Sequence, residues 1–388
     1  MGSPEAERRP MLLVYLYVTI FLTSMAYGTI TFLVPVYAEE LGASYVTLGI
    51  LGAVGSVVYT VMTLVSGFLL DRFERVRFYL GTTALGILVV LLFSFTTSIS
   101  QLMLVRGTLR IVAATFWVTA STLTADISPP EALTRSVGRY NISWILGFTV
   151  GPVIGGLISD LYGFRTLFGM LSIPVILSVM VILARISRNI KLRNSTGGSR
   201  LNFESIRHLV VAYAALLPFT LILGIYMAIL PGHMRAIGVP ASAIGMLLTM
   251  TNGVRGIGFI NVKRFVKWGA RRSLVLATFL LAVGLYLVSV SASTLGFIVP
   301  LSMYGLAAGI ITPVVLDYIA HRTPREALGT AMGLHEGIYG VGMSFGPLIG
   351  GAIAENFQPS TLYIGLAALS LLILPLSYRM ESRSNDGG

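Results

Sequence analysis

Charged residues and cysteine are what this sequence has least of. Its 388 residues include no Cys and are only 11% charged, whereas soluble domains are about 25% charged. The missing cysteines exclude disulfides, thiolate metal sites and cysteine nucleophiles, and so few charges cannot build a water-facing surface. The sequence also contains no Walker A motif, dinucleotide-binding glycine loop or H-E-x-x-H pair. We therefore expect neither an enzyme nor an ATP-driven pump, and we expect no cofactor and no metal.

Long apolar runs occupy most of the chain. Hydrophobic residues make up 55% of it, and the mean hydropathy is +0.83. A membrane-spanning helix needs about 20 consecutive apolar residues, and twelve such runs are separated by polar or Gly/Pro turns. The sequence therefore predicts an all-α polytopic membrane protein. The predicted helices begin near Met11, Ser44, Phe78, Gln101, Arg135, Phe164, Leu209, Ala241, Ser273, Leu295, Leu328 and Thr361.

The basic residues are distributed unevenly over the predicted loops. If both termini are cytoplasmic, 22 of the 27 Lys and Arg lie on the cytoplasmic side, and the outer loops contain only Arg165 and Arg235. This asymmetry follows the positive-inside rule and predicts that both ends of the chain are cytoplasmic. Anionic lipid headgroups attract basic residues at that surface, so the net charge of +11 indicates contact with membrane lipids and not with nucleic acid.

The chain repeats itself at an offset of 195 to 196 residues. The segment 151–156, Gly-Pro-Val-Ile-Gly-Gly, falls on 346–351, Gly-Pro-Leu-Ile-Gly-Gly. Two sets of six helices in the same orientation are one of the architectures of secondary transporters. A hydrophilic stretch separates the sets. The predicted domains are therefore a six-helix bundle over residues 1–185, a cytoplasmic linker over 186–208 and a second six-helix bundle over 209–388.

Glycines recur at spacings of four residues in the fifth and eleventh predicted spans. Such a face lets helices approach closely, and a proline in the same span permits a bend. Because both halves contain this pattern, we favour helix packing and bending over substrate contact. The residues concerned are Gly147, Gly151, Pro152, Gly155, Gly156, Gly342, Gly346, Pro347, Gly350 and Gly351.

Three segments carry a resemblance to a known family. Residues 66–77, Ser-Gly-Phe-Leu-Leu-Asp-Arg-Phe-Glu-Arg-Val-Arg, resemble the signature G-x-x-x-D-R-x-G-R-R of the major facilitator superfamily. Arg106 resembles the buried arginine of that family's motif in the fourth span, where Arg110 stands in place of the usual glycine, and residues 147–156 are similar to its antiporter motif. The resemblance covers essentially the whole chain. It implies the family's fold of twelve helices in two pseudo-symmetric bundles.

The resemblance also implies roles for these motifs. In the family, the antiporter motif is associated with proton-coupled exporters of prokaryotic plasma membranes, which favours efflux. The signature between the second and third spans implies a gate that holds the cytoplasmic helix ends together; its arginines could also serve only to fix the topology. The implied gate residues are Gly67, Asp71, Arg72 and Arg75.

Charges found in only one half are the better candidates for function. Arg106 and Arg110 lie in the fourth span, where the second half has Leu301 and Gly305. Being four residues apart, they share a helix face, to which Trp117 returns about three turns later. A mid-span arginine costs at least about 2.5–3.5 kcal/mol unless it faces water or a partner. For Arg110 we favour substrate contact, whereas Arg106 could instead reach the membrane interface or hold the first span.

Further candidate substrate ligands lie in other spans. Arg255, with Asn252 beside it, lies in the eighth span, and its alternative role is an ion pair with Glu336. Arg139 adds a cation near the inner end of the fifth span. In the first span, Tyr27 belongs to a polar stripe that either lines the cavity or packs against another helix.

Glu336 is the only acid more than one turn inside a predicted span. Together with His335 it replaces Asn141 and Tyr140 of the first half. Burial favours the protonated form of a carboxyl group, which lets it load and release a proton near neutral pH. We therefore expect Glu336 and His335 to couple transport to protons, with a static ion pair as the alternative.

The sequence thus predicts a monomeric secondary transporter that moves a small organic solute by alternating access. Four candidate cationic ligands against one acid favour an anionic or zwitterionic substrate. The alternative is a proton-coupled multidrug exporter, because 19 Phe, 17 Tyr and 15 Met could form an adaptable apolar pocket. A membrane sensor that keeps the fold without transporting is the third possibility.

Overall fold

The computed structural model describes residues 4–70, 72–187, 209–324 and 327–382. These ranges are helical, with short connections, and contain no strand. In the first half the helices are α1 (Pro4–Glu40), α2 (Tyr45–Leu70), α3 (Arg75–Phe93), α4 (Ile99–Ile127), α5 (Leu133–Met170) and α6 (Ser172–Val181), which continues as a π-helical turn, Ile182–Ile186. In the second half they are α7 (Val210–Ala228), α8 (Leu230–Ala236), α9 (Ala241–Ile260), α10 (Val262–Trp268), α11 (Ala270–Ser289), α12 (Ile298–Arg322), α13 (Leu328–Asn356), α14 (Pro359–Ser370) and α15 (Ile373–Ser382).

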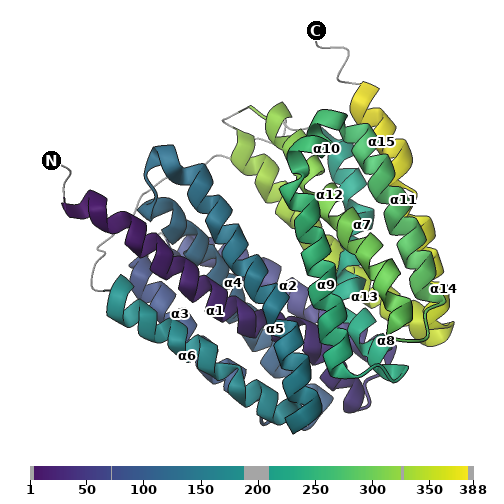
Figure 1. The fold of residues 1–388 in the computed structure, drawn as a ribbon, viewed down its shortest axis with the longest axis horizontal. Coiled ribbons are helices and arrows are strands. Elements are labelled where there is room, and N and C mark those ends of the chain that lie inside the picture. Colours follow the sequence, from purple (N-terminus) through teal and green to yellow (C-terminus); the bar gives the residue numbers. More distant parts are fainter. Residues whose placement is uncertain (1–3, 71, 188–208, 325–326, 383–388) are drawn as a thin grey trace. The chain divides into compact units, whose positions relative to one another are not determined.

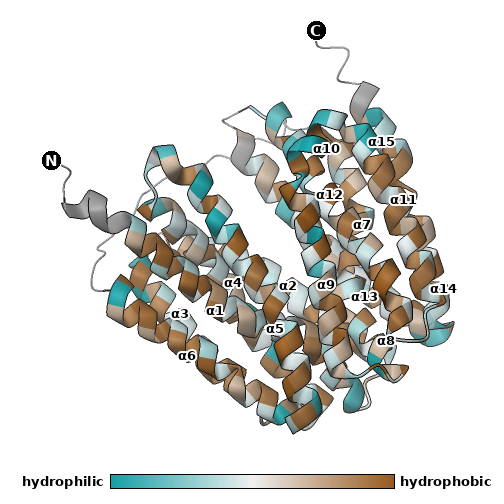
Figure 2. Ribbon diagram, viewed as in Figure 1, coloured by the Kyte–Doolittle hydropathy of each residue, from teal (hydrophilic) through white to brown (hydrophobic). Residues whose placement is uncertain are grey.

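The helices have the length and composition of membrane spans. Eleven helical stretches of the described chain are long and apolar enough to cross a bilayer, and one of them, Arg135–Ile186, has 52 residues. Since one span needs about 20 residues, this stretch holds two spans, and it is interrupted at Gly163, whose φ of 79° only glycine adopts readily. The prediction of twelve spans is confirmed. Apolar residues predominate along the long helices, whereas the short α10 is largely hydrophilic (Figure 2).

The chain forms two compact units, and each includes a short segment from the opposite half of the sequence. One unit comprises Met1–Leu41, Val54–Gly197 and Pro240–Met246, and the other comprises Gly42–Ala53, Gly198–Val239 and Leu247–Gly388. The first turns of α2 therefore belong to the unit of the second half, and the start of α9 belongs to the unit of the first half. Each unit is described below by itself.

The two units pack their helices in the same pattern. In the first, α5 lies along α1, α4 along α3, and α6 contacts both α1 and α3 (Figure 1). In the second, α13 lies along α7, α12 along α11, and α14 contacts α11. These are equivalent helices of the sequence repeat, so the offset of 195 to 196 residues corresponds to a repeated packing arrangement.

Glycines allow the closest of these approaches. A Cβ atom on Gly151 would lie 2.4 Å from the carbonyl oxygen of Met25 in α1, and one on Gly346 would lie 2.3 Å from that of Leu221 in α7. Such distances leave no room for a side chain, so the backbones are in direct contact. The same two helices are approached at comparable distances by Gly147, Gly155, Gly342 and Gly350.

The remaining motif glycines face the starts of α2 and α9, the two helix starts that belong to the unit of the opposite half. A Cβ atom on Gly156 would lie 2.4 Å from the carbonyl oxygen of Ala241, and one on Gly351 would lie 2.5 Å from that of Tyr45. Four residues beyond each of them, a carboxylate caps the same helix start. Asp160 Oδ1 accepts a hydrogen bond from the N–H of Ala241 at 3.1 Å, and Glu355 Oε2 accepts one from the N–H of Tyr45 at 2.8 Å. A carboxylate stabilises a helix N-terminus because it satisfies free N–H groups and complements the helix dipole.

Candidate functional site

Two arginines of α4 meet at a glycine of α2 inside the first unit. Arg106 and Arg110 are one helical turn apart, and a Cβ atom on Gly55 would lie 3.2 Å from Nε of Arg106 and 3.4 Å from Nε of Arg110. Both guanidinium groups therefore lie beside the same point of α2. Here the glycine leaves the space that the two long side chains occupy, since any larger residue would displace them.

The charge of this arginine pair is not compensated within the described chain. Arg106 is only 4% exposed, and its Nε and Nη1 atoms have no hydrogen-bond acceptor among the residues that the structure describes. Arg110 is half-buried, and neither arginine forms an ion pair with any acid that the structure describes. An unpaired buried charge costs several kcal/mol, so an anion placed against the pair would recover much of this energy.

One phenol lies near the same pair, and a second phenol lies near the first. Arg110 is in electrostatic range of Tyr59 on α2, which is in range of Tyr140 on α5. Phenol groups can donate hydrogen bonds to an oxyanion. Neither residue is predicted by the local sequence around the arginines, because both lie on other helices. The only signal for Tyr59 is that it corresponds to Arg255 at the offset of 196 residues.

The other candidate ligands of the first half lie in different surroundings. Tyr27 is 2% exposed, and its hydroxyl points at α3, where a Cβ atom on Gly86 would lie 2.3 Å from it. This is a packing position, which fits the second of the two roles that the polar stripe suggested. Trp117 belongs to an aromatic cluster, with ring centroids 6.3 Å from Trp144. Arg139 is exposed on α5.

The second unit has one arginine surrounded by tyrosines. The Nε atom of Arg255 on α9 is buried without an acceptor among the described residues, and its guanidinium carbon lies 5.3 Å from the ring centre of Phe259. Tyr226, Tyr304 and Tyr339 are all in electrostatic range of Arg255. Asn252, the predicted neighbour of Arg255, is half-buried on the same helix.

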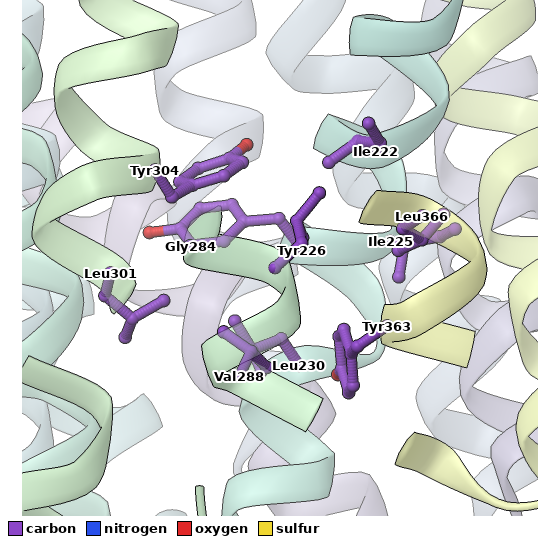
Figure 3. Close-up of a pocket in the computed structure, with 11 residues that line it drawn as sticks. Ile222, Ile225, Tyr226, Leu230, Gly284, Val288, Leu301, Tyr304, Tyr363 and Leu366 are labelled. Atoms are coloured by element: carbon purple, nitrogen blue, oxygen red, sulfur yellow. The ribbon is translucent and has the colours of Figure 1, made fainter. Parts of the chain in front are cut away.

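An apolar pocket adjoins this cluster. The rings of Tyr226 and Tyr304 stack with centroids 4.4 Å apart, and Figure 3 shows their hydroxyls at opposite ends of the stack. About 290 Å³ of empty space lies beside them, lined otherwise by aliphatic residues and Tyr363. Very little of this space is wide enough for a water molecule, so the pocket in this form holds no organic ligand.

The expected burial of Glu336 is wrong. Its side chain is 76% exposed, whereas that of His335 is 6% exposed. The position of a residue along a helix axis predicts its depth in the membrane, but not the direction in which its side chain points. The side chain of Glu336 points away from the buried face of α13 on which His335 lies. His335 Nδ1 lies 3.2 Å from Oε1 of Glu336, and its buried Nε2 has no partner among the described residues. No ion pair joins Glu336 to Arg255 in the described structure, so the alternative of a static pair with this arginine is not realised.

The predicted gate residues have separate environments. Asp71 lies outside the described residues. Gly67 has open space around its Cα, and the exposed Arg72 lies 4.4 Å from the ring centre of Phe68. Arg75 is buried and forms an ion pair with Asp126 at the end of α4. This partner was not predicted, because the two residues are far apart in the sequence.

A histidine of α8 is also buried. His233 is 8% exposed, and its Nδ1 lies 2.8 Å from the hydroxyl of Tyr45 at the start of α2. Burial lowers the pKa of His233 to about 4, because the charged imidazolium is disfavoured away from water. His233 is therefore neutral at physiological pH.

Comparisons with known proteins agree with the resemblance found in the motifs. The model of the Major Facilitator Superfamily matches residues 16–229 and again 212–388. An uncharacterized MFS-type transporter of Methanocaldococcus jannaschii is 22% identical over 373 residues, covering 94% of this chain and 96% of that protein. The multidrug resistance protein MdtG of Proteus mirabilis is 24% identical and covers 94% of each chain. Among solved structures, a bacterial homolog of the human lysosomal transporter Spinster superposes with a TM-score of 0.80 at 13% identity, over 98% of each chain.

Proposed function

Because the chain belongs to the Major Facilitator Superfamily, whose members are membrane transporters and not enzymes, we propose that it is a secondary transporter of small organic anions or zwitterions. It works by alternating access, with the two six-helix bundles over residues 1–185 and 209–388 moving against each other. The protein acts as a monomer in a prokaryotic plasma membrane, with both termini in the cytoplasm.

The observation that carries this proposal is the uncompensated arginine pair of α4. Arg106 is 4% exposed and two of its nitrogens have no acceptor in the described structure. Arg110 lies beside it at Gly55. A buried cation is tolerated in a membrane protein where it meets a partner or a water-filled path, and a substrate anion is such a partner. Arg255 supplies a third cation on α9, with Asn252 beside it, and Arg139 attracts the anion towards the cytoplasmic end of α5.

A proton-coupled multidrug exporter is the second candidate. It is favoured by the similarity to multidrug resistance proteins MdtG, at 24% identity, and by the aromatic clusters around Trp117 and Tyr226. The arginine pair argues against lipophilic cations as substrates, because no acid of the described chain lies beside it. Export is the expected direction for both candidates, given the antiporter motif. A sensor without transport would bind the same ligands without flux.

Transport in proteoliposomes separates these functions. We expect radiolabelled organic anions from a test panel to be exchanged across the membrane at rates well above those of protein-free vesicles. Lipophilic cations should cross no faster than in protein-free vesicles. The opposite preference would establish the multidrug exporter. Ligand-induced thermal stabilisation without any flux would establish the sensor.

Coupling to protons is assigned to the His335–Glu336 pair. The two side chains are in contact, with His335 Nδ1 3.2 Å from Oε1 of Glu336, and the side chain of Glu336 is exposed. In Glu336→Gln liposomes, a pH gradient should no longer drive uptake, while downhill exchange and substrate binding persist. Glu355→Gln changes an acid elsewhere on the same helix and should retain the response to the gradient. Unchanged pH-driven uptake in Glu336→Gln would place coupling at another group.

The cytoplasmic gate is assigned to Gly67, Asp71, Arg72 and Arg75. The ion pair of the buried Arg75 with the half-buried Asp126 joins the start of α3 to the end of α4, so that the residues of the gate adjoin a fixed contact within one unit. Asp71→Asn should reduce turnover much more than substrate affinity, because the gate stabilises one conformation and does not touch the substrate. Equal changes in both quantities would contradict this assignment.

A further inference from the structure

The strongest feature without an assigned ligand is the pair of arginines on α4, which brings two positive charges beside Gly55 of α2. We propose that Arg106 and Arg110 form a subsite for a doubly charged phosphoryl headgroup, so that the substrate is a phosphate monoester. This inference rests on the proposed function, transport of an organic anion, and names the substrate class for its binding site.

The charge count favours a dianion over a monoanion. Each Nε atom lies within 3.4 Å of the position that a Cβ of Gly55 would occupy, so the two guanidinium charges are adjacent. The nearest acid along α4, Asp126, is already paired with Arg75. A single negative charge would leave one of the two arginines uncompensated, whereas two charges on one group neutralise both. Because Arg106 is almost fully buried, the uncompensated charge would be costly.

The donor geometry favours one tetrahedral group over two separate carboxylates. A guanidinium presents parallel N–H bonds that match the oxygens of phosphate, and such charge-assisted bonds are about twice as strong as neutral ones. Two guanidiniums whose Nε atoms lie beside the same glycine can together bind the oxygens of a single phosphoryl group.

The repeat supports a ligand role for the pair. At the equivalent positions the second half has Leu301 and Gly305, and a Cβ atom on Gly305 would lie 2.5 Å from the carbonyl oxygen of Thr251 on α9. The second half therefore closes this helix contact with backbone, without any charge. The second half shows that this contact can form without arginines, which favours a binding role for the pair.

Matched esters test the proposal. Sulfate monoesters have the same tetrahedral shape as phosphate monoesters but carry one charge, and phosphate loses its second charge below a pKa of about 6. We would measure binding by titration calorimetry on the full-length protein, using phosphate and sulfate esters with phenyl, hexyl and glyceryl tails. At pH 8.0 we expect at least one phosphate ester to bind about tenfold or more tightly than its sulfate partner, and at pH 5.0 this ratio should collapse towards one.

Variants of Arg110 test whether this residue is responsible for the preference for phosphate over sulfate esters. Arg110→Gln should remove most of the phosphate-over-sulfate ratio, whereas Arg110→Lys, which keeps the charge, should retain it. Equal binding of phosphate and sulfate esters at pH 8.0 would overturn the dianion subsite and leave anion transport standing, as would a ratio unchanged by Arg110→Gln. If no ester of either kind binds while other organic anions do, the subsite is also overturned. If lipophilic cations alone bind, the proposed function itself fails.

Discussion

The two halves of the chain use the same packing but carry different charges. In both, a tyrosine of the first helix donates a hydrogen bond to a carbonyl oxygen at the start of the fifth: Tyr17 to Ser136 at 3.1 Å and Tyr213 to Ala331 at 3.0 Å. The glycine contacts and the carboxylate caps match in the same way. Interactions that are found in both halves are those that hold a six-helix unit of this kind together.

The differences are concentrated in the helices that carry the buried cations. Arg110 corresponds to Gly305, and Arg255 corresponds to Tyr59. Each half thus has its cation on a different helix, α4 in one and α9 in the other. Because the shared features already account for packing, the unshared arginines are where substrate recognition is expected. Substitutions that make one half resemble the other test this division directly.

The largest effect is expected from converting the arginines of α4 into their counterparts. Arg110→Gly and Arg106→Leu should each reduce anion transport at least about 100-fold, because truncating a partner of a desolvated charge pair costs several kcal/mol. The melting temperature should stay the same or rise, because an unpaired buried charge is removed. Transport assays and thermal unfolding of the same preparations measure both quantities.

The exposed Arg165 is the control for these arginine variants. Arg165→Leu removes a cation outside the site and should leave transport near the parent level. A pair of α4 variants that transport normally would show that the cations of the first half are not part of the binding site. Loss of folding together with transport would instead make them structural.

The next effect in size concerns the glycines that both halves share. Gly151→Ala and Gly346→Ala introduce a methyl group within 2.4 Å of a facing carbonyl oxygen, and overpacking of this kind costs about 1–3 kcal/mol. Both variants should lower the melting temperature by several degrees and to a similar extent. Gly138→Ala and Gly337→Ala are matched controls on the same helices, where nothing lies within 4 Å. These controls should gain up to about 1 kcal/mol from helix propensity. Tolerance of Ala at 151 or 346 would contradict the packing role.

How much of this could be predicted from the sequence depends on the range of the interaction. Hydropathy and the repeat predict the spans, and the resemblance of three motif segments indicates the family. The spacing of four residues places Arg106 and Arg110 on one face. These signals are local or periodic. The partner of Arg75 and the position of Gly55 depend on contacts between distant helices. The exposure of Glu336 depends on the rotation of α13 about its axis, which a single acid in an apolar helix does not specify.

A smaller effect is expected at the capped helix starts. Asp160→Ala and Glu355→Ala each remove a carboxylate that accepts a backbone hydrogen bond at the start of α9 or α2. Loss of a cap costs about 0.5–2 kcal/mol, so each variant should lose a few degrees of melting temperature, and the two losses should be similar. Glu131→Ala removes an exposed acid from a 3₁₀ turn and serves as the control. A loss in only one half would show that the caps, unlike the glycines, are not equivalent.

The smallest expected effect is a dependence of stability on pH that comes from His233 in the second half. His233 of the second half corresponds to Tyr37 of the first, which donates a hydrogen bond to the carbonyl oxygen of Thr96 at 2.6 Å. Burial lowers the pKa of His233 to about 4, against about 6.5 in the unfolded chain. The unfolded state therefore binds the proton more readily, so the stability contributed by neutral His233 is complete above pH 6.5 and is lost as the pH falls towards 4.

Between pH 7.5 and 6.0 this linkage amounts to about 0.8 kcal/mol, or roughly 2 °C in melting temperature. His233→Gln should remove this share of the acid sensitivity of the parent protein, because glutamine can still accept a hydrogen bond from Tyr45 but does not titrate. Thermal unfolding of both proteins in the same detergent at the two pH values measures the difference. His321→Gln, at a histidine whose side chain is 75% exposed, is the control. If acidification lowers the melting temperature of His233→Gln and of the parent by the same amount, the buried histidine does not contribute to the response of the protein to pH.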